Sequence, residues 1–226
     1  MGKHTKPPLP WALAWQPQQK TLTLEGEPVA QLSLSLPQIK SGGRGGQQIN
    51  RYYQALGRAW LRRWEGEFYC RACLALSRCR EESRPFAPWV GTLEGRATCQ
   101  EGDRLSLCLD VKEVQGDGRP LCLRLADNWT VSTGSPISGR ALLPGGRKAR
   151  RAQLEQLERQ GTELRASGLC FLDEDFARQL PRFLSPRNCC LAQEGWELYI
   201  PQCAMAPAIE EVVTFRLGPS APPSGK

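Results

Sequence analysis

The longest regular pattern in this chain of 226 residues is QQINRYYQALGRAWLRRWEGEFYCRACLALSRCREES, residues 47–83. Apolar side chains recur in it at every third or fourth position, which places them on one stripe of an amphipathic helix. A phase shift occurs at Gly66, and Pro85 cannot continue the hydrogen-bond ladder, so we expect one long helix over 47–83. The stripe consists of Ile49, Tyr53, Leu56, Trp60 and Trp64, followed after the shift by Tyr69, Ala72, Leu76 and Cys79.

Short segments on both sides of this helix alternate apolar and polar residues, which is the period of a strand with one buried face. Before the helix, residues 22–24 and 32–36 predict a hairpin that turns at Gly26 and ends at Pro37. Residues 41–46, SGGRGG, then predict a flexible loop rather than a phosphate-binding loop, because no Gly-Lys-Ser/Thr follows. After the helix, three further strands are predicted at 89–98, 104–114 and 121–131.

The C-terminal part of the chain contains the signals of two shorter helices. One spans 147–166, and the other begins at Asp173, its N-cap, and ends near Pro186. No linker divides the chain, so the sequence predicts a single α+β domain: an antiparallel sheet with one long helix and two shorter helices packed against it. Closing strands are predicted at 188–192, 196–201 and 212–217.

We expect this domain to span residues 20–217. Residues 1–19 are expected to form a flexible N-terminal arm, and residues 218–226, rich in Pro, Ser and Gly, a disordered tail. The sequence shows neither a signal peptide nor a twenty-residue apolar span. We therefore expect a cytoplasmic location, where thiols are kept reduced.

The composition excludes several classes of protein. With 40% hydrophobic and 23% charged residues, the chain is neither disordered nor membrane-spanning. Its one histidine, His4, excludes most histidine-based catalysis and any site with several histidine ligands. We expect no catalytic residue, no metal and no cofactor.

The ten cysteines include one CxxC pair, Cys70 and Cys73. A redox pair is expected at a helix N-terminus, where the helix dipole lowers the thiol pKa, but this pair lies inside the long helix. We therefore interpret the cysteines mainly as small buried hydrophobes. A cysteine-thiol enzyme or redox protein using Cys70 and Cys73 is the alternative. Cys108 and Cys122 lie on neighbouring predicted strands but not directly opposite each other. The sequence therefore permits a disulfide between them but does not imply one.

The formal charge of +7 is concentrated in the N-terminal arm and in two predicted helices. The simpler interpretation of this charge is that both helices have a basic, solvent-exposed face. The alternative is that the basic side chains form a patch that contacts phosphate groups. Nucleic-acid binding would also need exposed aromatics for stacking, and the aromatics lie on the buried stripe. It is therefore a third candidate function, through Arg51, Arg58, Arg62 and Arg63 on the first helix and Arg147, Lys148, Arg150 and Arg151 on the second.

Several short motifs occur in a recognisable order. They are LSLPQI at 34–39, INRYY at 49–53, NW at 128–129 with STGSPI at 132–137, SPRNCCL at 185–191 and LYIPQCAMAP at 198–207. This order resembles the RsiV-type domain of unknown function, and the likeness covers residues 20–217. That domain forms the extracytoplasmic part of the RsiV anti-sigma factor and an accessory part of the PdaC peptidoglycan deacetylase.

The resemblance implies an α+β domain that binds rather than catalyses. In RsiV the domain is the receptor for lysozyme, which it also inhibits. In PdaC the chemistry lies in a separate metal-dependent domain with histidine ligands, which this chain lacks. The resemblance further implies an extracytoplasmic location as the alternative to the cytoplasm, and it implies that Cys189, Cys190 and Cys203, which stand where the family tends to place aromatics, fill the core.

We therefore predict a non-enzymatic bacterial binding module, a monomer, that recognises a protein such as a muramidase or a cell-envelope ligand. Recognition would use strand edges and loops at two places. One is the turn with Gly116, Asp117, Gly118 and Arg119, where the family often has Gly-Gly-Ala-His. The other is the loop with Met205 and Glu210.

Overall fold

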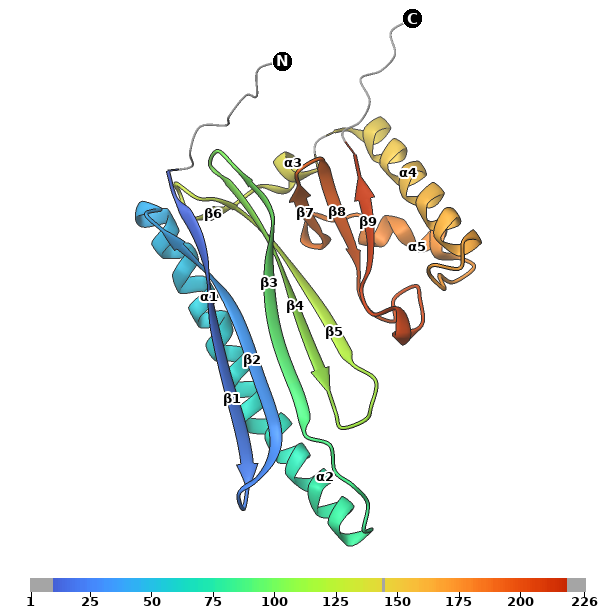
Figure 1. Ribbon diagram of the computed structural model, residues 1–226. Helices are drawn as coiled ribbons and strands as arrows, with labels where there is room; N and C mark the ends of the chain where they lie inside the picture. Colours follow the sequence, from blue (N-terminus) through green and yellow to red (C-terminus); the bar gives the residue numbers. More distant parts are fainter. Residues whose placement is uncertain (1–9, 144, 219–226) are drawn as a thin grey trace, which may run out of the picture.

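The computed structural model describes residues 10–143 and 145–218 and confirms the α+β fold class. The expectations for residues 1–9 and 219–226 lie outside the described residues. Two sheets are present, a main sheet of six strands and a small sheet of three. Figure 1 shows one long helix beside the main sheet and the shorter helices beside the small one.

The N-terminal hairpin is longer than the sequence pattern predicts. Strand β1 (Ala12–Leu24) pairs antiparallel with β2 (Glu27–Lys40), so residues 12–19 belong to the sheet and the expected arm over 1–19 is wrong there. Pro37 does not end β2 either. The strand on the other side of β2 pairs with it only at Ala30–Ser35, so Pro37 lies beyond the end of that pairing. Its missing N–H therefore leaves no hydrogen bond of that pairing unmade.

The predicted long helix is confirmed, and its phase shift has a structural cause. Helix α1 (Gly43–Arg63) continues through a π-helical turn, η1 (Trp64–Phe68), into α2 (Tyr69–Glu81). A π-turn holds extra residues, so it moves the apolar stripe around the helix axis and keeps Trp64, Phe68 and Ala72 buried. The helix begins at Gly43, so the loop expected over 41–46 is also too long.

The helix start is possible because glycine allows a close approach. A Cβ on Gly45 would lie 2.1 Å from the carbonyl oxygen of Val131, on the segment that follows the last long strand of the main sheet. The backbones of two distant segments therefore touch at this position, and only the absence of a side chain permits it.

The main sheet has the strand order β1-β2-β3-β4-β5-β6. Its remaining strands are β3 (Trp89–Glu101), β4 (Arg104–Val114), β5 (Leu121–Thr130) and the two-residue β6 (Ser135–Pro136). All neighbours pair antiparallel except β2 and β3, which are parallel because the long helix connects them as a crossover. The helix covers one face of this sheet, where Leu93, Leu105, Leu107 and Leu109 are fully buried.

The two shorter helices pack on the small sheet, not on the main one. The small sheet consists of β7 (Cys189–Ala192), β8 (Gly195–Ile200) and β9 (Val213–Leu217), and it shares a second core with α4 (Arg147–Ala166) and α5 (Phe176–Phe183). The N-cap of α5 is Asp175 rather than the predicted Asp173, whose N–H donates to the Met205 carbonyl. Short connections are α3 (Gly139–Leu142), η2 (Pro186–Asn188) and η3 (Ala208–Glu210).

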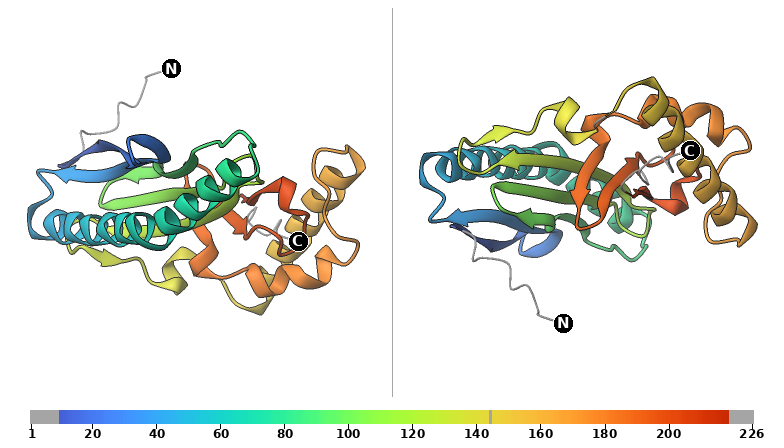
Figure 2. Two further views of the ribbon diagram at one scale, coloured as in Figure 1. Left: turned by 90° about the horizontal axis from the view of Figure 1, so that it is seen from below. Right: turned by 90° about the horizontal axis from the view of Figure 1, so that it is seen from above.

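The small sheet lies against the face of the main sheet that faces away from α1. Asn128 of β5 is buried there, accepts hydrogen bonds from the Ser106 hydroxyl and the Leu191 N–H, and donates one to the Cys189 carbonyl. Arg96 of β3 adds an ion pair to Glu197 of β8 at 2.8 Å. Figure 2 shows α4 and α5 grouped with the small sheet at one side of the molecule, away from β1.

None of the helices in residues 10–143 and 145–218 is long and apolar enough to cross a membrane.

Candidate binding surface

Three exposed apolar side chains stand on two connections that lie beside the small sheet. Ile209 comes from η3, and Phe171 and Leu169 come from the α4–α5 connection, where the Phe171 N–H donates to the Glu210 side chain at 3.0 Å. Their exposed fractions run from 66% at Phe171 to 74% at Leu169. We call these three residues the apolar rim. Leu121 and Leu123 of β5 are exposed too, but on the α1 face of the main sheet.

The rim borders a shallow hollow of about 340 Å³. Ile209 is among its lining residues, and charged side chains on the main-sheet face that is turned away from α1 form pairs in it. Lys112 Nζ lies 2.7 Å from Glu211 Oε1, and the Arg124 guanidinium donates to Asp110 Oδ2 at 2.9 Å and to the Thr214 hydroxyl at 2.9 Å. Paired charges beside exposed apolar groups are typical of a surface that binds another macromolecule.

The two loops that the sequence singled out lie close together at this surface. Gln202, at the start of the β8–β9 connection, donates from Nε2 to the Pro120 carbonyl and accepts the Cys122 N–H at Oε1, at 2.9 and 2.8 Å. Its Nε2 also donates to the Ala208 carbonyl at 2.9 Å. One side chain thus joins the β4–β5 turn to the loop that carries Glu210.

The individual site predictions have different outcomes. Glu210 lies in the hollow. Met205 is fully buried in the core of the small sheet, so its assignment as a ligand-binding side chain is wrong. Gly116 and Asp117 lie on the other side of the turn, where they line a second hollow against the end of α2, and Gly118 and Arg119 form the exposed tip between the two hollows.

Sequence reasoning missed the apolar rim. It also missed the exposure of Leu121 and Leu123, because the alternation of Leu121, Leu123 and Leu125 on β5 predicts one buried face. Ile209 and Phe171 stand in connections, and an isolated apolar residue in a loop carries no periodic signal. Such residues become a recognisable surface only when the fold brings them together.

The cysteines are less buried than the sequence interpretation holds. Cys99, Cys108, Cys170, Cys189 and Cys190 are buried, but Cys70 and Cys203 are exposed and the other three are half-buried. The core role of Cys203 is therefore wrong, while Cys189 and Cys190 do fill the core. Cys108 and Cys122 stand four residues apart in the β4–β5 register, opposite Ala126 and Lys112, and form no bridge.

Burial makes the thiol of Cys122, which lies in the hollow, a poor nucleophile. Desolvation and the nearby Glu211 carboxylate raise its pKa to about 11. Desolvation likewise raises the pKa of Cys189 and of Cys190 to about 12. Within the described residues no group of three or more Cys, His, Asp or Glu side chains could hold a metal ion.

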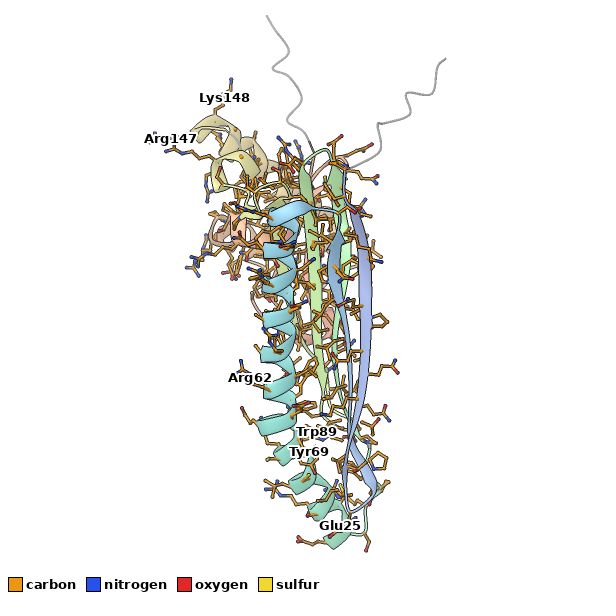
Figure 3. The ribbon with its side chains drawn as sticks, turned by 90° about the vertical axis from the view of Figure 1, so that its left-hand side faces the viewer. Glu25, Arg62, Tyr69, Trp89, Arg147 and Lys148 are labelled. Atoms are coloured by element: carbon orange, nitrogen blue, oxygen red, sulfur yellow. The ribbon has the colours of Figure 1, made fainter. Side chains whose placement is uncertain are left out.

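The predicted basic residues do not converge on one patch. Figure 3 shows Arg62 projecting from the outer face of the long helix, and Arg147 and Lys148 at one end of the molecule, well away from Arg62. Arg63 is held by Glu113 through two hydrogen bonds of 3.0 and 3.1 Å, and Arg150 donates to the Leu184 and Pro181 carbonyls.

Comparison with known proteins finds solved structures with a similar fold. No protein-family model matches this sequence, and no curated protein matches it. Two solved structures of proteins from the DUF3298 family, a family of unknown function, share the fold. One is from Bacteroides fragilis, with a TM-score of 0.66, 10% identity and coverage of 92% of this chain and 90% of that one. The other is from Pseudomonas aeruginosa PAO1, with a TM-score of 0.58, 16% identity and coverage of 93% and 91%.

Proposed function

We propose that this chain is a non-enzymatic binding module that recognises a partner protein through the apolar rim and the hollow it borders. The observation that carries the proposal is that three of the seven large apolar side chains exposed in the described residues stand on two connections joined by the Phe171–Glu210 hydrogen bond. Solvation of three such groups is unfavourable, and burying one large apolar side chain against a partner gains about 1.5–3 kcal/mol. A soluble domain keeps such a cluster exposed when it serves an interface.

The chemistry of the rim favours a binding role over a catalytic one. The two ion pairs in the hollow neutralise their own charges, and the thiol there has a raised pKa. A general base or nucleophile needs an unpaired group with a pKa near the working pH, which neither ion pair nor this thiol supplies. The RsiV-type resemblance supports the same role and adds a muramidase or a cell-envelope ligand as the expected partner.

Site-specific photocrosslinking tests this proposal. A photoreactive amino acid at Ile209 is expected to crosslink one dominant protein in cells that produce the chain. The matched control is the same amino acid at Leu74, an equally exposed apolar residue (61% against 67%) on α2, outside the rim. Identical products from both positions, or none from Ile209, would refute the proposal.

Direct binding tests the expected partner. Immobilised muramidase should retain the intact chain and lose it when Ile209 and Phe171 are both replaced by Asp, because a charge at each position must be desolvated in the interface. Leu74→Asp should leave retention unchanged. Cell fractionation in the same experiment reports whether the chain and its partner share a compartment.

A further inference from the structure

The outer edge of β5 is closed at both of its ends. At the start, the Gln202 carboxamide accepts the Cys122 N–H and donates to the Pro120 carbonyl, so it takes the two bonds that a neighbouring peptide group would take. At the other end, the Ile137 N–H donates to the Asn128 carbonyl, next to the short pairing of β5 with β6.

The middle of this edge is open. In an antiparallel ladder, alternate residues direct both their N–H and their C=O to the same side. Cys122 and Asn128 direct theirs outward, and the β4–β5 register has no bulge, so Arg124 and Ala126 direct theirs outward too. Within the part of the chain that the structure describes, no backbone or side-chain group bonds to those of Arg124 and Ala126 on that side.

The open stretch has a defined length. Six residue steps separate Cys122 from Asn128, which corresponds to roughly 20 Å of strand. An extended segment of about six residues therefore fits between Gln202 and β6. It would lie on the side of β5 that faces away from β4, in line with β6.

The flanks of the edge indicate which side chains such a segment carries. On the α1 face, Leu121 and Leu123 are exposed at alternate positions, and apolar residues of an added strand would cover them. Helix α1 flanks this face, since Tyr53 bonds to Asp127 and Arg63 to Glu113, the register partner of Leu121.

We propose that the open edge of β5 binds an extended segment of the partner protein as an added strand, with apolar residues at every second position. This mode of recognition rests on the proposed function, because the segment would be part of the protein that covers the apolar rim. Backbone hydrogen bonds to Arg124 and Ala126 hold the segment, and Leu121 and Leu123 fix its register.

One substitution should block the addition of a strand at this edge without unfolding the domain. Ala126→Pro deletes the outward N–H and places a ring on the edge, whereas the bonds from β5 to β4 belong to the neighbouring residues. The matched control is Gln19→Pro on β1, the opposite edge strand, two residues after the natural Pro17 and hence on the same side of that strand. Urea unfolding of both variants checks that each is folded.

The probe is a phage library of random octapeptides, selected on the intact chain. Enriched peptides are expected to carry apolar residues at every second position, to bind Ala126→Pro at least ten-fold more weakly, and to bind Gln19→Pro unchanged. On the unmodified chain, a saturating peptide should slow amide hydrogen exchange at Arg124 and Ala126 at least ten-fold, a measurement that needs no variant.

Three results would overturn the strand-addition proposal: no enrichment over a blank surface, equal binding to Ala126→Pro, or unchanged exchange at both amides. The two proposals fail separately. If Ile209 crosslinks a partner that Ala126→Pro still binds, the binding module stands and strand addition is wrong. If Ile209 crosslinks nothing, the proposed function itself is wrong.

Discussion

Asn128 links the two sheets through side-chain hydrogen bonds, and Asn128→Ala tests how much these bonds contribute to the free energy of unfolding. The side chain is 7% exposed and makes three hydrogen bonds, of 2.7 Å from Ser106, 3.0 Å from Leu191 and 2.8 Å to Cys189. Alanine leaves a hydroxyl, an N–H and a carbonyl without partners between the sheets, and Ser106 and Cys189 are fully buried.

The expected loss is large compared with the stability of a domain. An unsatisfied buried group costs about 1–3 kcal/mol, so three such groups lower the free energy of unfolding by about 3–5 kcal/mol, allowing for partial rescue by water. Domains of this kind are stable by about 5–15 kcal/mol, so the variant should still fold. With a urea slope of about 2–3 kcal/mol/M, the midpoint should fall by more than about 1 M.

The assay is urea unfolding followed by tryptophan fluorescence and circular dichroism, and Ser106→Ala is the partner variant. Ser106→Ala removes one of the three bonds and should cost less than Asn128→Ala. The double variant should be less destabilised than the sum of the two, because the Ser106–Asn128 bond is counted once in each single variant. A loss below about 1 kcal/mol for Asn128→Ala would refute the view that this residue joins the sheets.

Three further outcomes are expected. Gly91→Ala should destabilise the fold by about 1–3 kcal/mol in the same urea assay, because the new Cβ would lie 2.9 Å from the fully buried Trp64 ring, whereas Gly57→Ala meets only the half-buried end of Leu36 and should cost less. Burial acts to raise the pKa of Glu197, but hydrogen bonds from Arg96 and Tyr199 outweigh it and hold the pKa below 4.5. Its stabilisation is therefore full above pH 4.5 and is lost as the pH falls through the lower folded-state pKa, so Glu197→Gln should flatten the acid side of a stability–pH curve, and an unchanged acid side would contradict this account. Cys70 should react with a maleimide at pH 7 while Cys189 and Cys190 should react only after urea is added, a result that mass spectrometry of the labelled peptides checks and that rapid labelling of the buried pair would contradict.

Much of the fold is predictable from local pattern. The helix over 147–166 has the predicted bounds, and the strand over 104–114 does as well. The phase shift at Gly66 is visible in the sequence because an inserted π-turn displaces every later apolar position on the helix. These features depend on the spacing of side chains along one segment, and spacing is what a sequence records directly.

The pairing of distant segments was harder to predict from the sequence. Three features depend on which faces of distant segments meet: the division into two sheets, the parallel β2–β3 pair and the packing of α4 and α5 on the small sheet. The alternation of apolar and polar residues shows that a strand has a buried face, but it does not show which segment packs against that face. Met205 illustrates the limit. Its loop position favours exposure, but the loop folds back so that the side chain fills the small-sheet core.

The amino-acid sequence alone determined the fold class, the positions of most helices and strands and the absence of a multi-histidine site, since these follow from composition and local period. It also located the β4–β5 turn and the β8–β9 loop as places of interest. Only the tertiary structure decided that Gln202 joins these two segments and that the connection carrying Phe171 lies against the one carrying Ile209. Burial and proximity are properties of packed faces, and they exist only once segments that are far apart in the chain lie together.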